Sequence, residues 1–506
     1  MKSTSLSLIA GAVALAAVTG FAAVTAPDGG GTTTAGPAVR LPVERSSLLC
    51  PAPGLSDLAE TAYTSFTPAV KGGGTPAGTA ELLSTAAKDA VKDTGKSKDK
   101  KTGKADPDKP VVLLKEPGKP ATAEVSGADA PALVGTATGR LAPGWTAQQT
   151  TTVEAGDSRG LLGVSCTAPD TEFWFPAAST AKSREDYVHL TNPDDTAAVA
   201  DIELYGPDGT LKSDVGEGIT VPARSGVRVL ISTLTSKAED DVTVHVTTRT
   251  GRVGAVVRTA DSRTGSDWLP ASTEPASTLV LPGIPADATS VRLVAFAPGE
   301  DDADLEVKLL GKTGAVSPVG HEELHVKSQM TAGVDLKDLT RGEAGSLLLS
   351  PAEKGRATPV VAALRVVRGK GDNQEVGYIP ATGPVGAQAT AADNRAKGSV
   401  LSLTAPGAAG TVKVTASAGS KGGTPVSKTY QVAAGTTVAV TPPVPAGLKG
   451  TYALTVETQS GGPVHAARTL TVPMDGIPMF TVQTLPDDRG TVEVPAAEQD
   501  LSVLDD

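Results

Sequence analysis

The sequence predicts an all-β protein of tandem Ig-like antiparallel β-sandwich domains behind an N-terminal hydrophobic helix. Three observations lead to this fold class: an aromatic–proline motif that recurs at domain-sized spacing, short strands of alternating polarity between turns, and an uncharged run near the N-terminus. With 506 residues, the chain is long enough for about three to four domains of ordinary size.

The aromatic–proline motif is clearest at residues 173–176 (Phe-Trp-Phe-Pro) and returns as Trp268-Leu269-Pro270 and Tyr378-Ile379-Pro380. Its prolines lie 94 and then 110 residues apart, and Phe480 follows in a similar setting. This period is that of a small β domain. Because proline lacks the N–H that a strand ladder needs, we expect each motif at the end of the last strand of a domain.

Between the motifs, apolar and polar residues alternate over short segments, as in strands with one buried face. The expected strands of the three copies include 187–191 and 200–205, 290–296 and 303–309, and 399–404 and 410–415. Each copy is expected to close with a hairpin, such as 242–246 with 253–258, and a further hairpin is expected at 150–153 and 161–166.

Boundaries follow from the motif and from shifts in composition. The expected parts are a signal peptide or anchor at 1–26, a stalk at 27–45, a first β domain at 46–175, sandwich repeats at 176–269, 270–379 and 380–486, and an acidic tail at 487–506. Within the first domain, Ser56 is placed to cap a short helix through Tyr63. Residues 88–110 are Lys- and Asp-rich without large apolar side chains, so we expect a disordered insertion.

The N-terminal run covers residues 6–24, which carry no charge, and it follows Met1 and Lys2. A secretory h-region is usually ~7–15 residues and a spanning helix ~17–25, so a cleaved signal peptide and a retained membrane anchor both stay open. Val24-Thr25-Ala26 has the pattern of a cleavage site, although Pro27 would hinder cleavage there. In both cases we expect an extracytoplasmic protein, membrane-anchored or secreted.

Composition narrows the partners. The net charge is −11 and basic residues are not clustered with aromatics, so nucleic acid is not an expected partner. The two cysteines, Cys50 and Cys166, can form one disulfide in an oxidising compartment. Two separate buried thiols are the alternative.

Four strings match catalytic patterns but lack the required context. His321-Glu-Glu-Leu-His325 fits the H-E-x-x-H zinc motif, which requires a helix, yet it aligns with strands of the sister copies. In a strand, residues four apart are separated by about 13 Å, too far for two ligands of one zinc ion. Ser158 lies in a G-x-S-x-G string that we place in a hairpin turn rather than at a strand-to-helix elbow.

The other two strings are Ser179-Thr-Ala-Lys182 and Lys312-Thr-Gly, which fit S-x-x-K and K-T-G of penicillin-binding proteins but lack the intervening S-x-N. The pairs Asp194-Asp195 and Asp301-Asp302 lack the ligand spacing of a calcium loop. His189 and His245 fall within strand patterns. We therefore expect no catalytic residue, no metal ligand and no cofactor.

Several short segments carry a resemblance. Residues 159–166, Trp174-Phe175-Pro176, Leu190-Thr-Asn-Pro193 and Asp267-Trp268-Leu269-Pro270 are similar to an actinobacterial family of exported proteins of unknown function. The likeness covers roughly residues 45–480. It implies a cell-envelope β protein with an N-terminal membrane segment, and it implies no activity and no functional residues.

The sequence thus favours a non-catalytic exported protein that acts as a structural or binding scaffold in the cell envelope. Its expected partner is a cell-wall polymer or an envelope protein, with membrane contact through the N-terminal helix if that helix is not cleaved. The alternative is an envelope enzyme for glycan assembly, or an accessory protein of such an enzyme.

Overall fold

The computed structural model describes residues 39–495 except 55, 70–76, 86–108, 129, 214, 354 and 356. The predicted hydrophobic helix and most of the Lys-rich insertion lie outside these residues. Within the described ranges the chain is all-β, its strand pairs are antiparallel, and the helical segments are single 3-10 turns at Gly139–Leu141 and Ile231–Thr233. The predicted all-β class is confirmed, and no described helix is long and apolar enough to cross a membrane.

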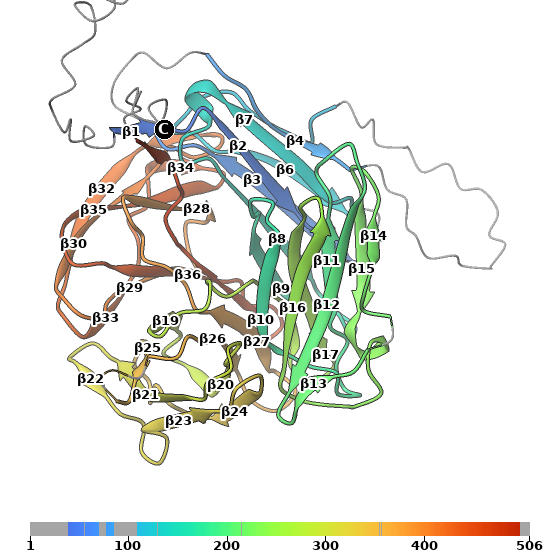
Figure 1. Ribbon diagram of the computed structural model, residues 1–506. Helices are drawn as coiled ribbons and strands as arrows, with labels where there is room; N and C mark the ends of the chain where they lie inside the picture. The colour runs from blue at the N-terminus through green and yellow to red at the C-terminus, as the bar shows by residue number, and fades with distance from the viewer. Residues whose placement is uncertain are drawn as a thin grey trace, which may run out of the picture. The chain divides into compact units, whose positions relative to one another are not determined.

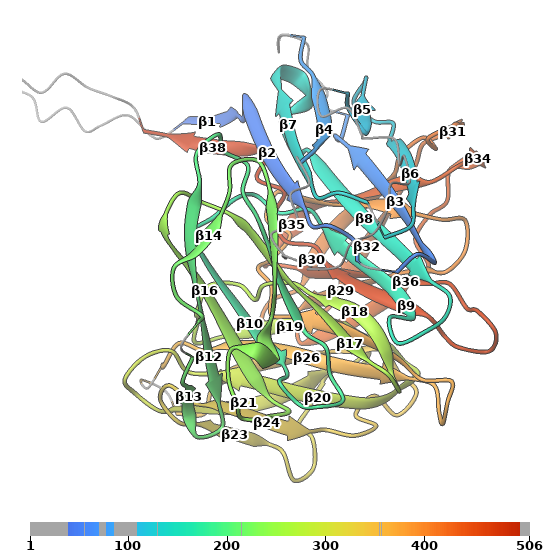
Figure 2. The same cartoon turned by 90° about the vertical axis from the view of Figure 1, so that its right-hand side faces the viewer.

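The chain divides into two units, residues 42–491 and the two chain ends. In the described part of the ends, β1 (Val39–Pro42) pairs with β38 (Thr491–Val494). The unit 42–491 contains eight four- or five-stranded sheets, which share buried clusters in pairs. We call these the first to fourth sheet pairs, in chain order (Figures 1 and 2).

The first sheet pair consists of β2 (Arg45–Cys50), β3 (Ala59–Phe66), β4 (Ala80–Ser84), β5 (Val112–Leu114), β6 (Ala121–Ser126), β7 (Leu133–Thr138), β8 (Thr146–Val153) and β9 (Gly160–Ser165). One sheet has the order β2-β7-β4-β5 and the other β6-β3-β8-β9. The prediction of a helix after Ser56 is wrong, because residues 59–66 form β3, which pairs with both β6 and β8. Its alternating Thr, Tyr and Phe side chains suit a buried strand.

The second sheet pair consists of β10 (Glu172–Ala178), β11 (Tyr187–Thr191), β12 (Ala198–Gly206), β13 (Gly209–Leu211), β14 (Ile219–Val221), β15 (Gly226–Leu230), β16 (Val242–Thr250), β17 (Gly254–Asp261) and β18 (Gly265–Leu269). Its sheets are β10-β16-β12-β13, with β14 beside β12, and β15-β11-β17-β18. Along β12 the exposure alternates residue by residue, as the polarity pattern predicts.

The third sheet pair consists of β19 (Leu279–Ile284), β20 (Ala288–Phe296), β21 (Ala303–Leu310), β22 (Ala315–Val316), β23 (Glu323–Val326), β24 (Thr331–Asp335), β25 (Gly345–Pro351), β26 (Val361–Arg368) and β27 (Glu375–Pro380). The fourth consists of β28 (Gln388–Asn394), β29 (Ser399–Ala405), β30 (Gly410–Ala416), β31 (Gly422–Thr424), β32 (Val426–Val432), β33 (Thr436–Val440), β34 (Ala446–Lys449), β35 (Tyr452–Gly461), β36 (His465–Thr471) and β37 (Phe480–Thr484).

All four sheet pairs have the same strand order. Setting aside β14, β23, β31 and β34, each pair has eight strands, of which the first, sixth, third and fourth form one sheet and the fifth, second, seventh and eighth form the other. The first region is therefore a copy of the other three. The sixth and seventh strands, expected as a hairpin at 242–246 and 253–258, instead lie in opposite sheets. The hairpin expected at 150–153 and 161–166 is confirmed as β8 and β9.

The aromatic–proline motif occupies two different places. Trp268 and Tyr378 lie toward the ends of eighth strands, β18 and β27, as expected. Phe480 also belongs to an eighth strand, β37, but it begins that strand rather than ending it. The Phe173-Trp-Phe-Pro segment instead lies in β10, a first strand that pairs with β16 of the second sheet pair. The alignment of this segment with the other two motifs is therefore wrong. Its structural counterpart is the Pro282-containing strand β19, which has a register shift at the same point.

The four sheet pairs contact one another in a closed order. First strands contact the seventh strand of the next pair: β10 contacts β26, β19 contacts β36, and β28 contacts β8. Leu49 of β2 likewise lies against Gly254 of β17, where an added Cβ would come within 2.9 Å of Leu49. The eighth strands also meet, β9 with β18, β18 with β27, β27 with β37 and β37 with β9. We call these four strands the central cycle.

Candidate functional site

Glycines allow the strands of the central cycle to approach closely. A Cβ on Gly163 of β9 would lie 2.5 Å from the side chain of Thr481 on β37, and a Cβ on Gly377 of β27 would lie 2.8 Å from the Phe480 ring. Carbon atoms of separate residues do not pack at such distances. Larger residues at these two positions would separate the sheet pairs.

Two buried carboxyl groups hold the central cycle together. Asp267 of β18 accepts hydrogen bonds from the Gly163 N–H of β9 at 3.2 Å and from the Thr481 hydroxyl of β37 at 3.2 Å. Glu375 of β27 accepts one from the Leu161 N–H of β9 at 3.1 Å. Each carboxyl group thus connects its own sheet pair to at least one other.

Burial sets the charge of these groups. It raises the pKa of Glu375 to about 8, although the Leu161 N–H and the Arg159 guanidinium, 3.9 Å away, act in the opposite direction. Burial also raises the pKa of Asp267 well above its ordinary value, and the nearby Glu375 adds to the rise. Glu375 is consequently mostly protonated at neutral pH, which avoids a buried negative charge.

A pocket of about 440 Å³ lies between the second and third sheet pairs. Its lining is predominantly polar and includes Arg184, Asp240, Asp241, Asp261, Arg263, Thr264, Arg292, Arg365 and Gln374. Gln374 precedes Glu375, so the pocket begins directly beside the central cycle. We call this cavity the junction pocket.

Ion pairs across the junction hold the lining arginines in place. Arg292 of β20 forms a bidentate pair with Asp241, in which Nε lies 2.7 Å from Oδ1. Arg365 of β26 donates to Thr264 at 3.0 Å and pairs with Asp261 at 3.4 Å. Because these partners come from different sheet pairs, the charged groups also fix the geometry of the pocket.

The deepest arginine is Arg184, whose side chain is 6% exposed. Its Nε and Nη2 lie 3.0 and 2.7 Å from the two Asp186 oxygens, and Nη2 donates to the Tyr378 hydroxyl of β27 at 2.9 Å. Burial alone would lower the pKa of Arg184, but Asp186 and Tyr378 raise it above the ordinary value. The guanidinium therefore stays charged at the pocket floor.

The zinc-like string is not assembled. His325 lies on β23, with its Nδ1 atom 2.7 Å from Asp304 Oδ1. His321 lies in the preceding turn, where its backbone N–H donates to the Pro318 carbonyl. In the described part of the chain, no three His, Cys, Asp or Glu side chains gather as metal ligands. The two histidines thus lie in a strand and a turn rather than on one turn of a helix.

The serine strings occupy turns and buried positions. Ser158 lies in the turn between β8 and β9. Ser179 is buried, and its hydroxyl donates to the Glu239 carbonyl at 2.9 Å. Of the Asp pairs, Asp194 forms a bidentate ion pair with Arg252, and Asp302 accepts the Ser328 N–H.

The strand histidines pack against tryptophans. His189 lies edge-on to Trp268, and burial lowers the pKa of His189 well below its ordinary value. His245 stacks on Trp174 with a ring separation of 3.6 Å, while its two nitrogens lie 3.1 and 3.0 Å from Glu203 and Glu172.

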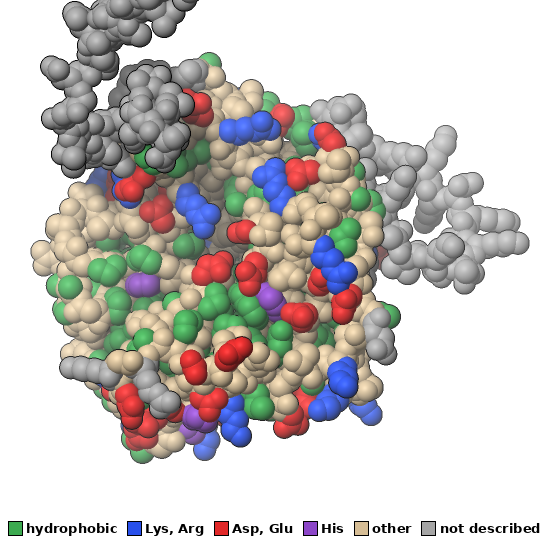
Figure 3. Space-filling view, viewed as in Figure 1, with side chains coloured by type: hydrophobic (Ala, Val, Ile, Leu, Met, Phe, Trp, Pro, Cys, Tyr) green, Lys and Arg blue, Asp and Glu red, His purple; other side chains and the backbone are tan. Residues whose placement is uncertain are grey.

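Acidic side chains gather toward the middle of the face seen in Figure 3.

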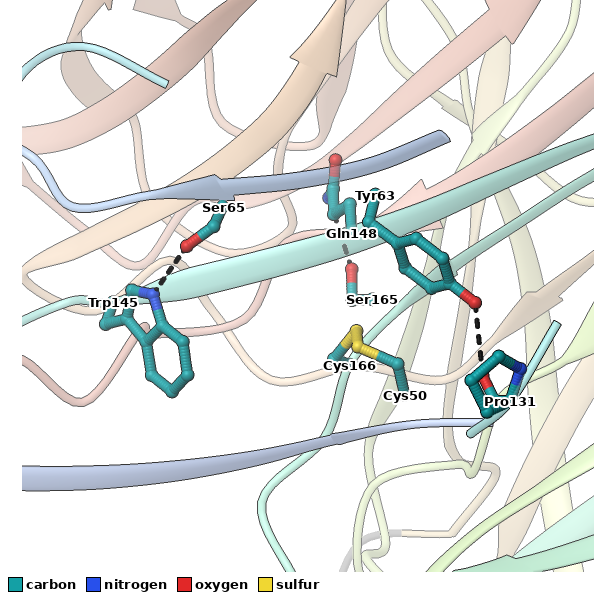
Figure 4. The surroundings of a disulfide bond; sticks show 8 residues. All are labelled: Cys50, Tyr63, Ser65, Pro131, Trp145, Gln148, Ser165 and Cys166. Carbon is teal, nitrogen blue, oxygen red and sulfur yellow. Dashed lines mark hydrogen bonds between the residues drawn. A yellow bond between two sulfur atoms is a disulfide. The ribbon is translucent and has the colours of Figure 1, made fainter. Parts of the chain in front are cut away.

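Cys50 and Cys166 form a disulfide in the first sheet pair. It joins the end of β2 to the residue after β9 and lies among buried side chains (Figure 4). Nearby, the Trp145 indole N–H donates to Ser65 at 2.9 Å and the Tyr63 hydroxyl donates to the Pro131 carbonyl at 3.3 Å. The cross-link spans 116 residues, including the Lys-rich insertion.

Sequence reasoning missed the central carboxyl groups and the junction pocket. Asp267 belongs to the recurring motif, and an acidic residue beside a buried tryptophan was a usable signal for a buried carboxyl group. Glu375, Arg292 and Arg365 gave no such signal, because their partners lie more than 50 residues away in the chain.

Comparison with known proteins gives one match. A family model, DUF5719, described as a family of unknown function, matches residues 121–443. These residues run from β6 of the first sheet pair to beyond β33 of the fourth. No curated protein and no solved structure matches the chain.

Proposed function

The chain belongs to the DUF5719 family, and from this premise we propose that it is a non-catalytic binding scaffold of the cell envelope. In this proposal the four sheet pairs are tandem Ig-like sandwiches, and the protein is exported and either anchored by its N-terminal run or released. The partner is a cell-wall polymer.

The closed order of the sheet pairs carries this proposal. Each pair has two neighbours, and buried groups such as Asp267 join pairs that are distant in the chain. Such a body keeps its surface loops and pockets in fixed positions, which lowers the entropic cost of binding.

Two further observations support export and a non-catalytic role. The Cys50–Cys166 disulfide is typical of proteins that fold in an oxidising compartment. The serine of the S-x-x-K string, Ser179, is buried and already donates its hydroxyl hydrogen to a carbonyl. An acylation mechanism needs that hydroxyl free beside a base.

The test is co-sedimentation of residues 40–506 with insoluble actinobacterial cell wall at low and high salt. We expect binding that survives high salt, because hydrogen bonds in a partly buried polar pocket are screened less than binding through lysine charges alone. Binding lost at high salt would assign the interaction to the Lys-rich insertion. Absence of binding at both salt concentrations would contradict the wall-polymer proposal.

A further inference from the structure

We propose that the junction pocket binds a neutral sugar unit of a polysaccharide. This inference rests on the proposed binding function and names the ligand class and the place where it binds. The volume of about 440 Å³ falls in the range of small-molecule sites. Ten of the twelve lining residues are polar or charged, so a ligand that fits must offer hydrogen-bonding groups.

Donors and acceptors lie together in the pocket. Arg292 and Arg365 line the pocket, and each guanidinium has N–H groups beyond those that its ion-pair and hydroxyl partners accept. Asp240 and Asp241 present carboxylate oxygens on the same lining. A guanidinium has five N–H donors and a carboxylate about four acceptor positions, so the ion pairs leave both kinds of group available.

This mixture selects hydroxyl groups. The four lining arginines are balanced by the three lining carboxylates and by Asp186, so the pocket has little net charge with which to attract an anion or a cation. A sugar hydroxyl donates to a carboxylate and accepts from a guanidinium at the same time. A neutral polyhydroxylated ring therefore satisfies the lining without adding charge to a partly buried site.

The backbone beside the pocket is strained. Ala177 of β10 lines it with φ at 78°, in the left-handed region that non-glycine residues rarely adopt. The counterpart in β19 is Gly283, for which φ of 92° costs nothing. Strained residues persist where the surroundings determine them, and they cluster at ligand sites. Ala177 is 3% exposed and belongs to a hydrophobic cluster, so the bulge places a small buried residue at the pocket wall.

Three variants test the proposal. Ser183→Trp fills the mouth of the pocket from an exposed position, while Arg263→Ala and Asp240→Ala each remove one charged group from its edge. The control is Arg252→Ala, which removes an exposed arginine of the same sheet pair that pairs with Asp194 outside the pocket. Unchanged thermal unfolding of all four variants shows that they fold.

The probe is an array of neutral pentose, hexose and N-acetylhexosamine disaccharides with matched uronic acids and sugar phosphates. We expect binding to one or more neutral sugars, loss of it in Ser183→Trp, and about a tenfold weakening in each edge variant, as for hydrogen bonds to charged groups. Arg252→Ala should bind as the wild type does. The same proteins are then tested with insoluble cell wall.

Each contrary result is distinct. Equal wall and array binding by the wild type and Ser183→Trp would overturn the assignment of the pocket and leave the proposed function standing. Selective binding of uronic acids or sugar phosphates would overturn the neutral-sugar class. If the wild type binds neither the array nor the wall, the pocket assignment and the proposed function are both overturned.

Discussion

The junction between the second and third sheet pairs and the junction between the third and fourth are built from equivalent strands. In the first of them β10 contacts β26, and in the other β19 contacts β36. Both first strands contain a proline followed by a residue with positive φ, Ala177 in one and Gly283 in the other, and both shift register there. The two bulges nevertheless face different surroundings.

At the third–fourth junction the bulge is packed. A Cβ on Gly283 would lie 2.7 Å from the Cβ of Ala467 in β36. At the second–third junction the residue in the same place carries a Cβ and borders the junction pocket. The comparison shows that one repeated element either closes a junction or leaves a pocket, depending on the side chains that the neighbouring pair presents.

The largest expected effect comes from Arg184→Met at the second–third junction. The substitution leaves Asp186 buried without its partner, and breaking a buried pair in this way costs about 3–5 kcal/mol of unfolding free energy. The matched variant is Arg368→Met, which loses contacts with Asp287 and with Thr471 across the third–fourth junction. Asp287 is 60% exposed and returns to water, so this loss should be smaller. Equal losses in urea unfolding would contradict the buried pairing.

Gly283→Ala should destabilise the protein by about 1–3 kcal/mol, because it adds left-handed strain and a clash with Ala467. Urea unfolding measures the change. Gly342→Ala is the matched control, since its φ of 90° is close to that of Gly283 but no atom lies within 4 Å of the added Cβ. An equal cost in both variants would show that packing at Gly283 adds nothing to the strain.

Glu375→Gln should change how stability depends on pH. The folded-state pKa of Glu375, about 8, exceeds its ordinary value of 4.5, so between these values the folded protein binds more protons than the unfolded chain. The wild type therefore loses up to about 1.4 kcal/mol per pH unit as the pH rises through this window, and the glutamine variant lacks this contribution.

Urea unfolding at about pH 5 and about pH 8 measures the difference between the two proteins. We expect the variant to gain stability relative to the wild type as the pH rises. Glu217→Gln, at an exposed ion pair with Arg249, serves as the control, and because it keeps Glu375 its stability should depend on pH as that of the wild type does. A difference that stays constant with pH would mean that Glu375 titrates as an exposed carboxyl group does.

The smallest effect is expected from Ala177→Gly. Glycine relieves the strain at φ of 78° but removes a buried methyl group and increases the entropy of the unfolded chain, so the net change in stability should stay within about 0.5 kcal/mol. Thermal unfolding would detect it. A loss of stability as large as that of Gly283→Ala would show that burial of the Ala177 methyl group outweighs the relief of strain.

The strands were the part of the fold best predicted from the sequence. Residues 187–191 coincide with β11, and 399–404 and 410–415 fall within β29 and β30. Alternation of polar and apolar residues is a local property of the sequence. Because one face of each of these strands is buried, the alternation predicts the strand without tertiary information.

Pairing was less predictable. Residues 242–246 and 253–258 follow each other as a hairpin would, yet they enter opposite sheets. The kinship of the first sheet pair with the others was hidden because the Lys-rich insertion falls between β4 and β5 and lengthens that copy. The Phe173 segment and the Trp268 motif have similar residues, but one lies in a first strand and the other in an eighth strand.

Sequence patterns could not predict the candidate site. The junction pocket joins Asp241 to Arg292 and Asp261 to Arg365, and the central cycle joins Gly163 to Thr481. Such contacts depend on how sheet pairs meet, and neither spacing nor polarity reports that. The rejected catalytic strings, by contrast, were judged from local context, because a strand and a turn cannot present the geometry of a helix.

The closed order of the sheet pairs has a consequence for the connectivity of the chain. Near the ends of the unit 42–491, the Val43 N–H donates to the Gly490 carbonyl at 3.1 Å, and β9 and β37 are in contact. A short peptide could therefore join residue 42 to residue 491, with new ends opened in the loop between β18 and β19. We expect this circular permutant to fold with the same disulfide and the same central contacts, because a closed array has no terminal member whose place in the chain must be first or last.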